Sequence, residues 1–286
     1  MSPSSHFVAV ILTGAAVTAF AANSLLCRLA LHDGGMDPVG FTVIRLCSAA
    51  LALAIILRFR RGDHTATRAG SWLSAVWLFG YAFAFSYAYI ALETGTGALL
   101  LFGAVQVTMI SIGLLTGERP RAQEWFGLVL ALAGLVYLLL PGANAPSWLP
   151  AASMVGAGIA WGLYSLRGRG ATDPGAATCG NFVRTVPMAI VVGLIFAAQF
   201  HTTTNALLAA LASGAIASGL GYVLWYAALR YLTATRAAIV QLLSPVLATL
   251  AGVAVLDETL TSRILIAAVA GFTGVILAAT ARKHSS

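Results

Sequence analysis

The stretch LLTGERPRAQEWFGLVLALAGLVYLLL, residues 114–140, occurs a second time in diverged form as AVLDETLTSRILIAAVAGFTGVILAAT, residues 254–280. Glu118 aligns with Glu258 at an offset of 140 residues, and apolar residues match along both stretches. Two further pairs of segments repeat in the same order at offsets of 141 and 137 residues: ANSLLCR (22–28) with LYSLRGR (163–169), and Tyr89, Ala91 and Leu92 with Tyr226, Ala228 and Leu229. Three matches at nearly one period indicate that the second half of the chain duplicates the first.

The composition is that of a membrane protein. Of the 286 residues, 59% are hydrophobic and only 9% are charged, whereas soluble proteins use about 25% charged residues. A membrane-spanning helix needs about 20 apolar residues in succession, and such runs fill this chain, so we expect the lipid bilayer as its surroundings. The net charge of +7 is then a matter of orientation, and we expect no nucleic acid as a partner. No cleavable signal peptide is expected, because no positively charged region precedes the first apolar stretch.

The apolar runs predict an all-α membrane protein with ten transmembrane helices. The predicted spans are 7–31, 38–58, 70–92, 95–116, 124–141, 148–168, 175–199, 205–229, 234–255 and 262–281. Gly, Pro, Asp and Thr cluster between them, as expected for turns. We therefore divide the chain into a first five-helix repeat (7–141), a short external linker (142–147), a second five-helix repeat (148–281) and a cytoplasmic tail (282–286).

Lysine and arginine are distributed unevenly between the two sides of these spans. The side that holds the N-terminus receives thirteen of them, and the opposite side receives only Arg28, Arg45 and Arg263. Because cytoplasmic loops carry the excess of basic residues, we expect both termini in the cytoplasm and the protein in a bacterial-type inner membrane. Five helices are an odd number, so the second repeat must enter the membrane from the opposite face. The sequence therefore predicts two inverted repeats.

Inverted repeats are typical of secondary transporters, which bind substrate near the bilayer centre where the repeats meet. We accordingly expect a small-molecule substrate and alternating access. The sequence offers no catalytic motif, no metal-ligand spacing and no cofactor signature, and its three cysteines (Cys27, Cys47 and Cys179) are interpreted as packing residues. We therefore expect no enzymatic activity, and an intramembrane enzyme is the remote alternative.

Several local motifs resemble those of one known family. Each half ends its fourth helix with a glutamate (TGE at 116–118, LDE at 256–258), and Pro245 precedes Glu258 by thirteen residues. Each half also opens its second helix with Asp-Pro, at 37–38 and 173–174. The chain resembles the drug/metabolite transporter superfamily in its form with two EamA-type domains. The resemblance implies a transporter, and bacterial two-domain members of about this length are often similar to exporters of amino acids, aromatic ones included. Drugs, nucleotide-sugars and sugar phosphates are the alternative cargo.

Polar residues inside the predicted spans are candidates for substrate contact, because polar groups are costly at membrane depth. Pro245 cannot donate a backbone hydrogen bond and so frees the carbonyl of Gln241, which makes Pro245 the predicted hinge. The alternative for these polar side chains is that they only hold helices together. The predicted substrate-binding residues of this kind are Asn23, Gln106, Tyr164, Gln241 and Ser244.

Aromatic residues supply a second signal. Tyr81 and Phe85 lie on one stripe of the third span at four-residue spacing, Trp161 lies on the sixth and Tyr222 on the eighth. A site walled by rings favours a flat or apolar substrate, and we assign these four residues to substrate binding. The alternative is an interfacial belt, to which we assign Trp72, Trp125 and Trp148 at the segment ends.

The charged residues restrict the mechanism. All nine acids and all five histidines lie at or near segment ends or in loops. Proton-driven transporters usually carry such a group at membrane depth, so we expect a neutral or zwitterionic substrate and no obligatory proton coupling. Arg28 and Arg45 are expected to extend outward to the interface, with binding of a substrate carboxylate as the alternative. Small residues on the terminal helices either close the bundle or form a dimer face, so we expect a monomer or a weak dimer.

Overall fold

The computed structural model describes residues 3–61, 69–139 and 147–258, together with some of the residues between 262 and 277. All regular elements in these residues are helical. The α-helices are α1 (Pro3–Leu31), α2 (Pro38–Arg61), α3 (Trp72–Ala88), α4 (Thr94–Leu115), α5 (Ala122–Leu139), α6 (Trp148–Gly168), α7 (Pro174–Ile195), α8 (Thr204–Ala212), α9 (Gly221–Leu229), α10 (Ala234–Gln241) and α11 (Leu243–Leu256). A helix satisfies its own backbone hydrogen bonds, which an apolar surrounding requires.

The first nine predicted spans each coincide with helical residues, and α8 and α9 join through a π-helical segment, Ser213–Leu220, into one span. Seven helical stretches of the described residues are long and apolar enough to cross a membrane, when Thr204–Leu229 and Ala234–Leu256 are each taken as one stretch. The helix α3 is a shorter apolar helix. The seventh predicted span ended too late: α7 ends at Ile195, and the three residues Ala197–Gln199 form a separate 3-10 turn. The tenth span, 262–281, falls mostly outside the described residues, so the total of ten helices stays a prediction.

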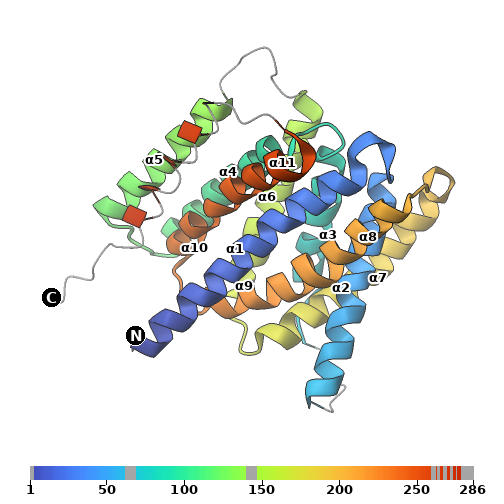
Figure 1. Ribbon diagram of the computed structural model, residues 1–286. Coiled ribbons are helices and arrows are strands. Elements are labelled where there is room, and N and C mark those ends of the chain that lie inside the picture. The colour runs from blue at the N-terminus through green and yellow to red at the C-terminus, as the bar shows by residue number, and fades with distance from the viewer. Residues whose placement is uncertain are drawn as a thin grey trace.

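The two halves of the chain interleave. Figure 1 shows α1 running across the bundle beside α9 and α11 of the second half. In the same way α2 packs against α7, while α3 and α4 both pack against α6. The buried core therefore lies between the halves, and both halves contribute to it.

Glu118 and Glu258 tie these halves together. Glu118 follows α4 and accepts hydrogen bonds from the backbone N–H groups of Ala234 (2.8 Å) and Thr235 (3.2 Å) at the start of α10. Glu258 follows α11 and accepts a hydrogen bond from the backbone N–H of Thr94, 3.0 Å away at the start of α4. Each glutamate thus caps a helix of the other half, and α4 runs antiparallel to α10 and α11.

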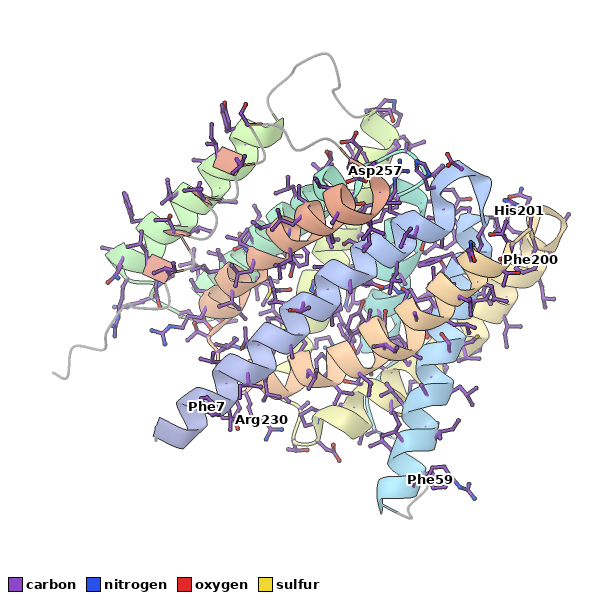
Figure 2. The ribbon with its side chains drawn as sticks, in the orientation of Figure 1. Phe7, Phe59, Phe200, His201, Arg230 and Asp257 are labelled. Atoms are coloured by element: carbon purple, nitrogen blue, oxygen red, sulfur yellow. The ribbon has the colours of Figure 1, made fainter. Side chains whose placement is uncertain are left out.

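The ends of the bundle separate the loops into two groups. In Figure 2, one end of the bundle holds Phe7, Phe59 and Arg230. The other end holds Phe200, His201 and Asp257. This is the grouping that the predicted path of the chain requires, because it puts the N-terminal part of α1 and the ends of α2 and α9 at the same end of the bundle. Cytoplasmic termini remain a prediction.

Pro245 marks a break in the ninth span. The helix stops at Gln241 and resumes at Leu243, and Leu242 between them has a ψ angle of −13°. A proline has no N–H to donate to the carbonyl four residues earlier and its ring pushes that carbonyl away, which accounts for the break. The matching helix of the first half, α4, is uninterrupted and contains no proline. The fourth and ninth spans therefore differ at the position of this proline.

Two glycines of α6 allow α4 to approach closely. A Cβ atom added at Gly158 would lie 2.4 Å from the carbonyl oxygen of Leu101, and one added at Gly162 would lie 3.0 Å from Thr108. Small residues at four-residue spacing permit such contacts between membrane helices. This contact fixes the position of Trp161, which lies between the two glycines.

Candidate functional site

The hydroxyl of Tyr81 is the centre of a buried hydrogen-bond network. It accepts a hydrogen bond from Asn23 Nδ2 at 3.2 Å, one from Arg45 Nη2 at 3.0 Å and one from the hydroxyl of Tyr222 at 3.0 Å. The four residues come from α1, α2, α3 and α9, and all four side chains are buried. Residues of both repeats therefore meet at one polar point inside an otherwise apolar core.

Arg45 lies inside this network. It is 1% exposed, and besides the bond to Tyr81 it donates from Nη2 to Tyr222 (2.7 Å) and from Nε to Ser218 (2.9 Å). Its guanidinium carbon lies 5.1 Å from the ring centroid of Tyr81 and 5.0 Å from that of Phe85, within the range of cation–π attraction. The expectation that Arg45 extends outward is wrong, because these partners hold it in the core.

The π-helical segment Ser213–Leu220 supplies the remaining hydroxyl groups. Ser213 donates to Asn23 Oδ1 at 2.6 Å, and Ser218, the acceptor for Arg45, lies 3.4 Å from the same oxygen. A π-helical insertion changes which residues face inward, and such insertions are frequent at functional sites. Here the segment turns two serines five residues apart toward one asparagine.

Aromatic rings surround the network on its apolar side. The ring centroid of Trp161 lies 4.5 Å from that of Tyr222 and 5.0 Å from that of Tyr81. Phe20 of α1 contacts Trp161 edge-on, with centroids 5.1 Å apart, and also contacts Tyr222 at 5.9 Å. We call Phe20, Tyr81, Trp161 and Tyr222 the aromatic cluster. It has the composition that binds flat or apolar groups.

Gln241 joins the aromatic cluster to the broken ninth span. Its side-chain oxygen accepts the indole N–H of Trp161 at 2.7 Å, and its nitrogen donates to the carbonyl of Ala237 at 3.0 Å. Gln106 of α4 donates to the next carbonyl, that of Ala238, and its own side-chain oxygen is buried without a hydrogen-bond partner. Both glutamines therefore contact α10 immediately before the break.

The structure gathers most of the predicted site residues and separates the others. Asn23, Tyr81, Trp161, Tyr222 and Gln241 form one connected set, and Phe85 lies under Arg45. Tyr164 lies at its edge, with its centroid 5.5 Å from that of Trp161 and its hydroxyl buried without a partner. Ser244 instead donates to the carbonyl of Val17 at 3.2 Å, a contact that joins α11 to α1. A substrate-binding role for all of these residues remains a prediction.

Four residues of the buried network and the aromatic cluster were not among the predicted site residues: Phe20, Arg45, Ser213 and Ser218. An arginine inside a membrane segment marks a functional site by default, so Arg45 carried a usable signal in its position seven residues after Pro38. Phe20 stands three residues before Asn23 and thus on the same helix face. The two serines carried no such signal, because helical spacing of 3.6 residues does not place residues five apart on one face.

Within the described ranges no three His, Cys, Asp or Glu side chains are placed to hold a metal ion. The described acids lie at helix ends, as with Asp37 and Asp173, which cap the starts of α2 and α7. Glu118 also receives an ion pair from Arg169 at 2.9 Å. Partial burial raises the pKa of Glu118, but the hydrogen bonds from α10 and the charge of Arg169 outweigh it and leave the pKa below its ordinary value.

Comparison with known proteins identifies the chain. Residues 7–140 match the EamA-like transporter family, and residues 148–280 match it a second time. The chain belongs to the EamA-like transporter family. This confirms the resemblance to the drug/metabolite transporter superfamily and places two copies of the EamA unit along the chain. The EamA-like transporter is accordingly a multi-pass membrane protein, and its buried network joins residues of both units.

The chain is similar along most of its length to two other proteins. The EamA-like transporter is 52% identical over 268 residues to the uncharacterized protein PA1977 of Pseudomonas aeruginosa, a match that covers 94% of this chain and 93% of that protein. It is also similar to a crystal structure of another protein, with a TM-score of 0.74 and 18% identity over 94% of this chain and 96% of that one. The second likeness supports the fold.

Proposed function

We propose that this EamA-like transporter exports small neutral or zwitterionic metabolites, with aromatic and apolar amino acids as its substrates. Export proceeds by alternating access at the aromatic cluster, across a bacterial-type inner membrane with both termini in the cytoplasm. No obligatory proton transfer accompanies it. The observation that carries this proposal is the packing of Tyr81, Trp161 and Tyr222 around a hydrogen-bonded polar centre to which both repeats contribute.

The chemistry of the cluster supports the substrate class. Stacking and edge-on ring contacts favour an aromatic group beyond the area that it buries. The neighbouring hydroxyl, amide and guanidinium groups offer hydrogen bonds to the polar end of an amino acid. A substrate that is apolar at one end and polar at the other matches this division of the site.

The interleaving of the repeats supports alternating access. The rings of the cluster belong to α1, α3, α6 and α9, and they contact one another directly, so a substrate must separate helices of the two repeats in order to enter. Gln241 connects Trp161 to α10 next to the break before Pro245. A movement of the broken span would therefore shift the cluster, which is the basis for assigning the hinge to Pro245.

The position of the acids supports transport without obligatory proton coupling. Among the described acids, Asp37, Glu93, Asp173 and Asp257 all adjoin helix ends, and Glu124 lies in the first turn of α5. None of these donates to or accepts from the network around Tyr81. A proton carrier would need to exchange protons at membrane depth.

The test is efflux from liposomes that contain the purified protein. Labelled phenylalanine, threonine and a nucleotide-sugar are compared, each with and without an imposed pH gradient. The proposal predicts selective phenylalanine efflux whose rate and end point do not respond to the pH gradient. Efflux of the nucleotide-sugar in its place would overturn the substrate class. Uphill movement that requires the pH gradient would overturn the absence of proton coupling.

A further inference from the structure

Arg45 carries a buried charge that its protein partners do not neutralise. A guanidinium stays protonated in proteins, and its contacts here are the neutral groups of Ser218, Tyr81, Tyr222 and Phe85. Among the residues that the structure describes, no carboxylate forms an ion pair with Arg45. Because an uncompensated buried charge is costly, its presence at the centre of the fold calls for an anionic partner.

One nitrogen of Arg45 is free to bind that partner. A guanidinium has five N–H groups; the Nε group and the two on Nη2 are directed at Ser218, Tyr81 and Tyr222. Nη1 is buried and has no hydrogen-bond partner. The guanidinium that carries these two N–H groups lies against the ring of Tyr81. Tyr81 in turn belongs to the aromatic cluster. The free donors and the rings are therefore parts of the same site.

We propose that Arg45 binds the carboxylate of the transported substrate through Nη1, so that it selects amino acids and other small organic acids over analogues in which an amide replaces the carboxylate. This inference rests on the proposed function and deepens it by naming the group that the site recognises. A carboxylate fits better than a phosphate, because Arg45 supplies one positive charge and, among the residues that the structure describes, no second basic side chain hydrogen-bonds to the network around Tyr81. Charge-assisted hydrogen bonds are the strong ones in such a site.

The recognition can be measured without transport. The affinity of the purified protein is determined by calorimetry for two matched pairs, phenylalanine with phenylalaninamide, and 3-phenylpropionate with 3-phenylpropionamide. Each pair differs at the carboxylate, and the second pair has no ammonium group. We expect the wild-type protein to bind each acid at least about tenfold more tightly than its amide, the ratio that one charge-assisted hydrogen bond supplies.

Variants assign the preference to Arg45. Arg45→Gln removes the charge and should bring the acid-to-amide ratio close to one, while Arg45→Lys keeps the charge and should retain most of the preference. Arg184→Gln is the matched control, because Arg184 lies in α7 and donates to the carbonyls of Ala69 and Gly180. It should leave the ratio unchanged. Monodisperse elution and a cooperative thermal transition show that each variant is folded.

The outcomes separate this inference from the proposed function. Equal affinity of the wild-type protein for acid and amide, an unchanged ratio in Arg45→Gln, or binding of none of the four compounds would overturn the role of Arg45. If phenylalanine does not leave liposomes but 3-phenylpropionate is still preferred over its amide through Arg45, the substrate class is wrong and the carboxylate site stands. If phenylalanine leaves liposomes and the ratio does not depend on Arg45, the proposed function stands alone.

Discussion

Glu118 and Glu258 occupy equivalent positions in the two repeats, and each caps the start of a helix in the other repeat. Glu118 reaches from the end of α4 to the start of α10, and Glu258 reaches from the end of α11 to the start of α4. A glycine lies beside each carboxylate, Gly113 and Gly252, where an added Cβ would stand 3.0 Å and 2.2 Å from the glutamate oxygen. The antiparallel pair formed by α4 and the α10–α11 span is therefore held at both of its ends by the same device.

Replacement of Glu118 by alanine should lower thermal stability. The change removes the acceptor for two backbone N–H groups at the start of α10 and the partner of Arg169. Loss of a helix cap costs about 1 kcal/mol, with a range of roughly 0.5–2. Glu93→Ala is the matched control, because Glu93 stands at the start of α4 and its side chain makes no capping hydrogen bond. Thermal unfolding in detergent measures both, and equal midpoints would contradict the capping role.

The same carboxylate predicts a pH dependence. The pKa of Glu118 in the folded protein lies below its ordinary value of 4.5, so the folded state favours the ionised form. The stabilisation is then fully present above about pH 4.5 and is lost as the pH falls through the lower pKa of the folded state. The difference in unfolding midpoint between wild type and Glu118→Gln should stay constant from pH 7 to pH 5 and shrink at lower pH. A difference that grows on acidification would contradict the assignment.

Replacement of Pro245 by alanine should slow transport without unfolding the protein. Alanine supplies the missing N–H and removes the ring that keeps the carbonyl of Gln241 away, which favours a continuous α10–α11 helix. We expect a several-fold lower rate of phenylalanine efflux and an unchanged or higher unfolding midpoint. Pro187 provides the control, because it lies inside the uninterrupted helix α7. An unaltered rate in Pro245→Ala, or an equal loss in Pro187→Ala, would remove the hinge assignment.

The contact between α4 and α6 can be tested with two glycines of one helix. Gly158→Ala places a Cβ against the backbone of Leu101 and should cost about 1–3 kcal/mol through overpacking. At Gly156 an added Cβ meets no atom within 4 Å, so Gly156→Ala should leave stability unchanged or raise it slightly. The unfolding midpoints of the two variants in detergent measure this difference in stability. Similar midpoints for both variants would show that the close approach is not required.

The features that could be predicted from the sequence depend on single residues or on the order of residues along the chain. The break next to Gln241 follows from one proline, and the repeat with its matched glutamates is visible in the order of residues. The partner of each glutamate was not visible, because Glu118 caps a helix that begins 116 residues later. The cap depends on how the two repeats pack, which the order of residues does not reveal.

Arg45 is a second residue whose partners could not be predicted from the sequence. Its place near the outer end of a predicted span favoured an outward side chain, since long basic side chains reach the interface from there. Its partners Ser218 and Tyr222 lie 173 and 177 residues later in the chain. A π-helical segment that the helical period does not reveal brings Ser218 into place. The burial of Arg45 thus depends on long-range packing, while its residue type already indicated a functional position.

We propose that the aromatic cluster binds the transported substrate. The most direct test is phenylalanine efflux from liposomes by the wild-type protein, Trp161→Leu and Trp148→Leu. Trp161 is 2% exposed and hydrogen-bonded to Gln241, whereas Trp148 is 78% exposed at the start of the same helix. We predict at least about a tenfold loss of efflux in Trp161→Leu, the effect of losing roughly 1.4 kcal/mol of aromatic binding, and wild-type efflux in Trp148→Leu. Wild-type efflux by a correctly folded Trp161→Leu protein would contradict the account.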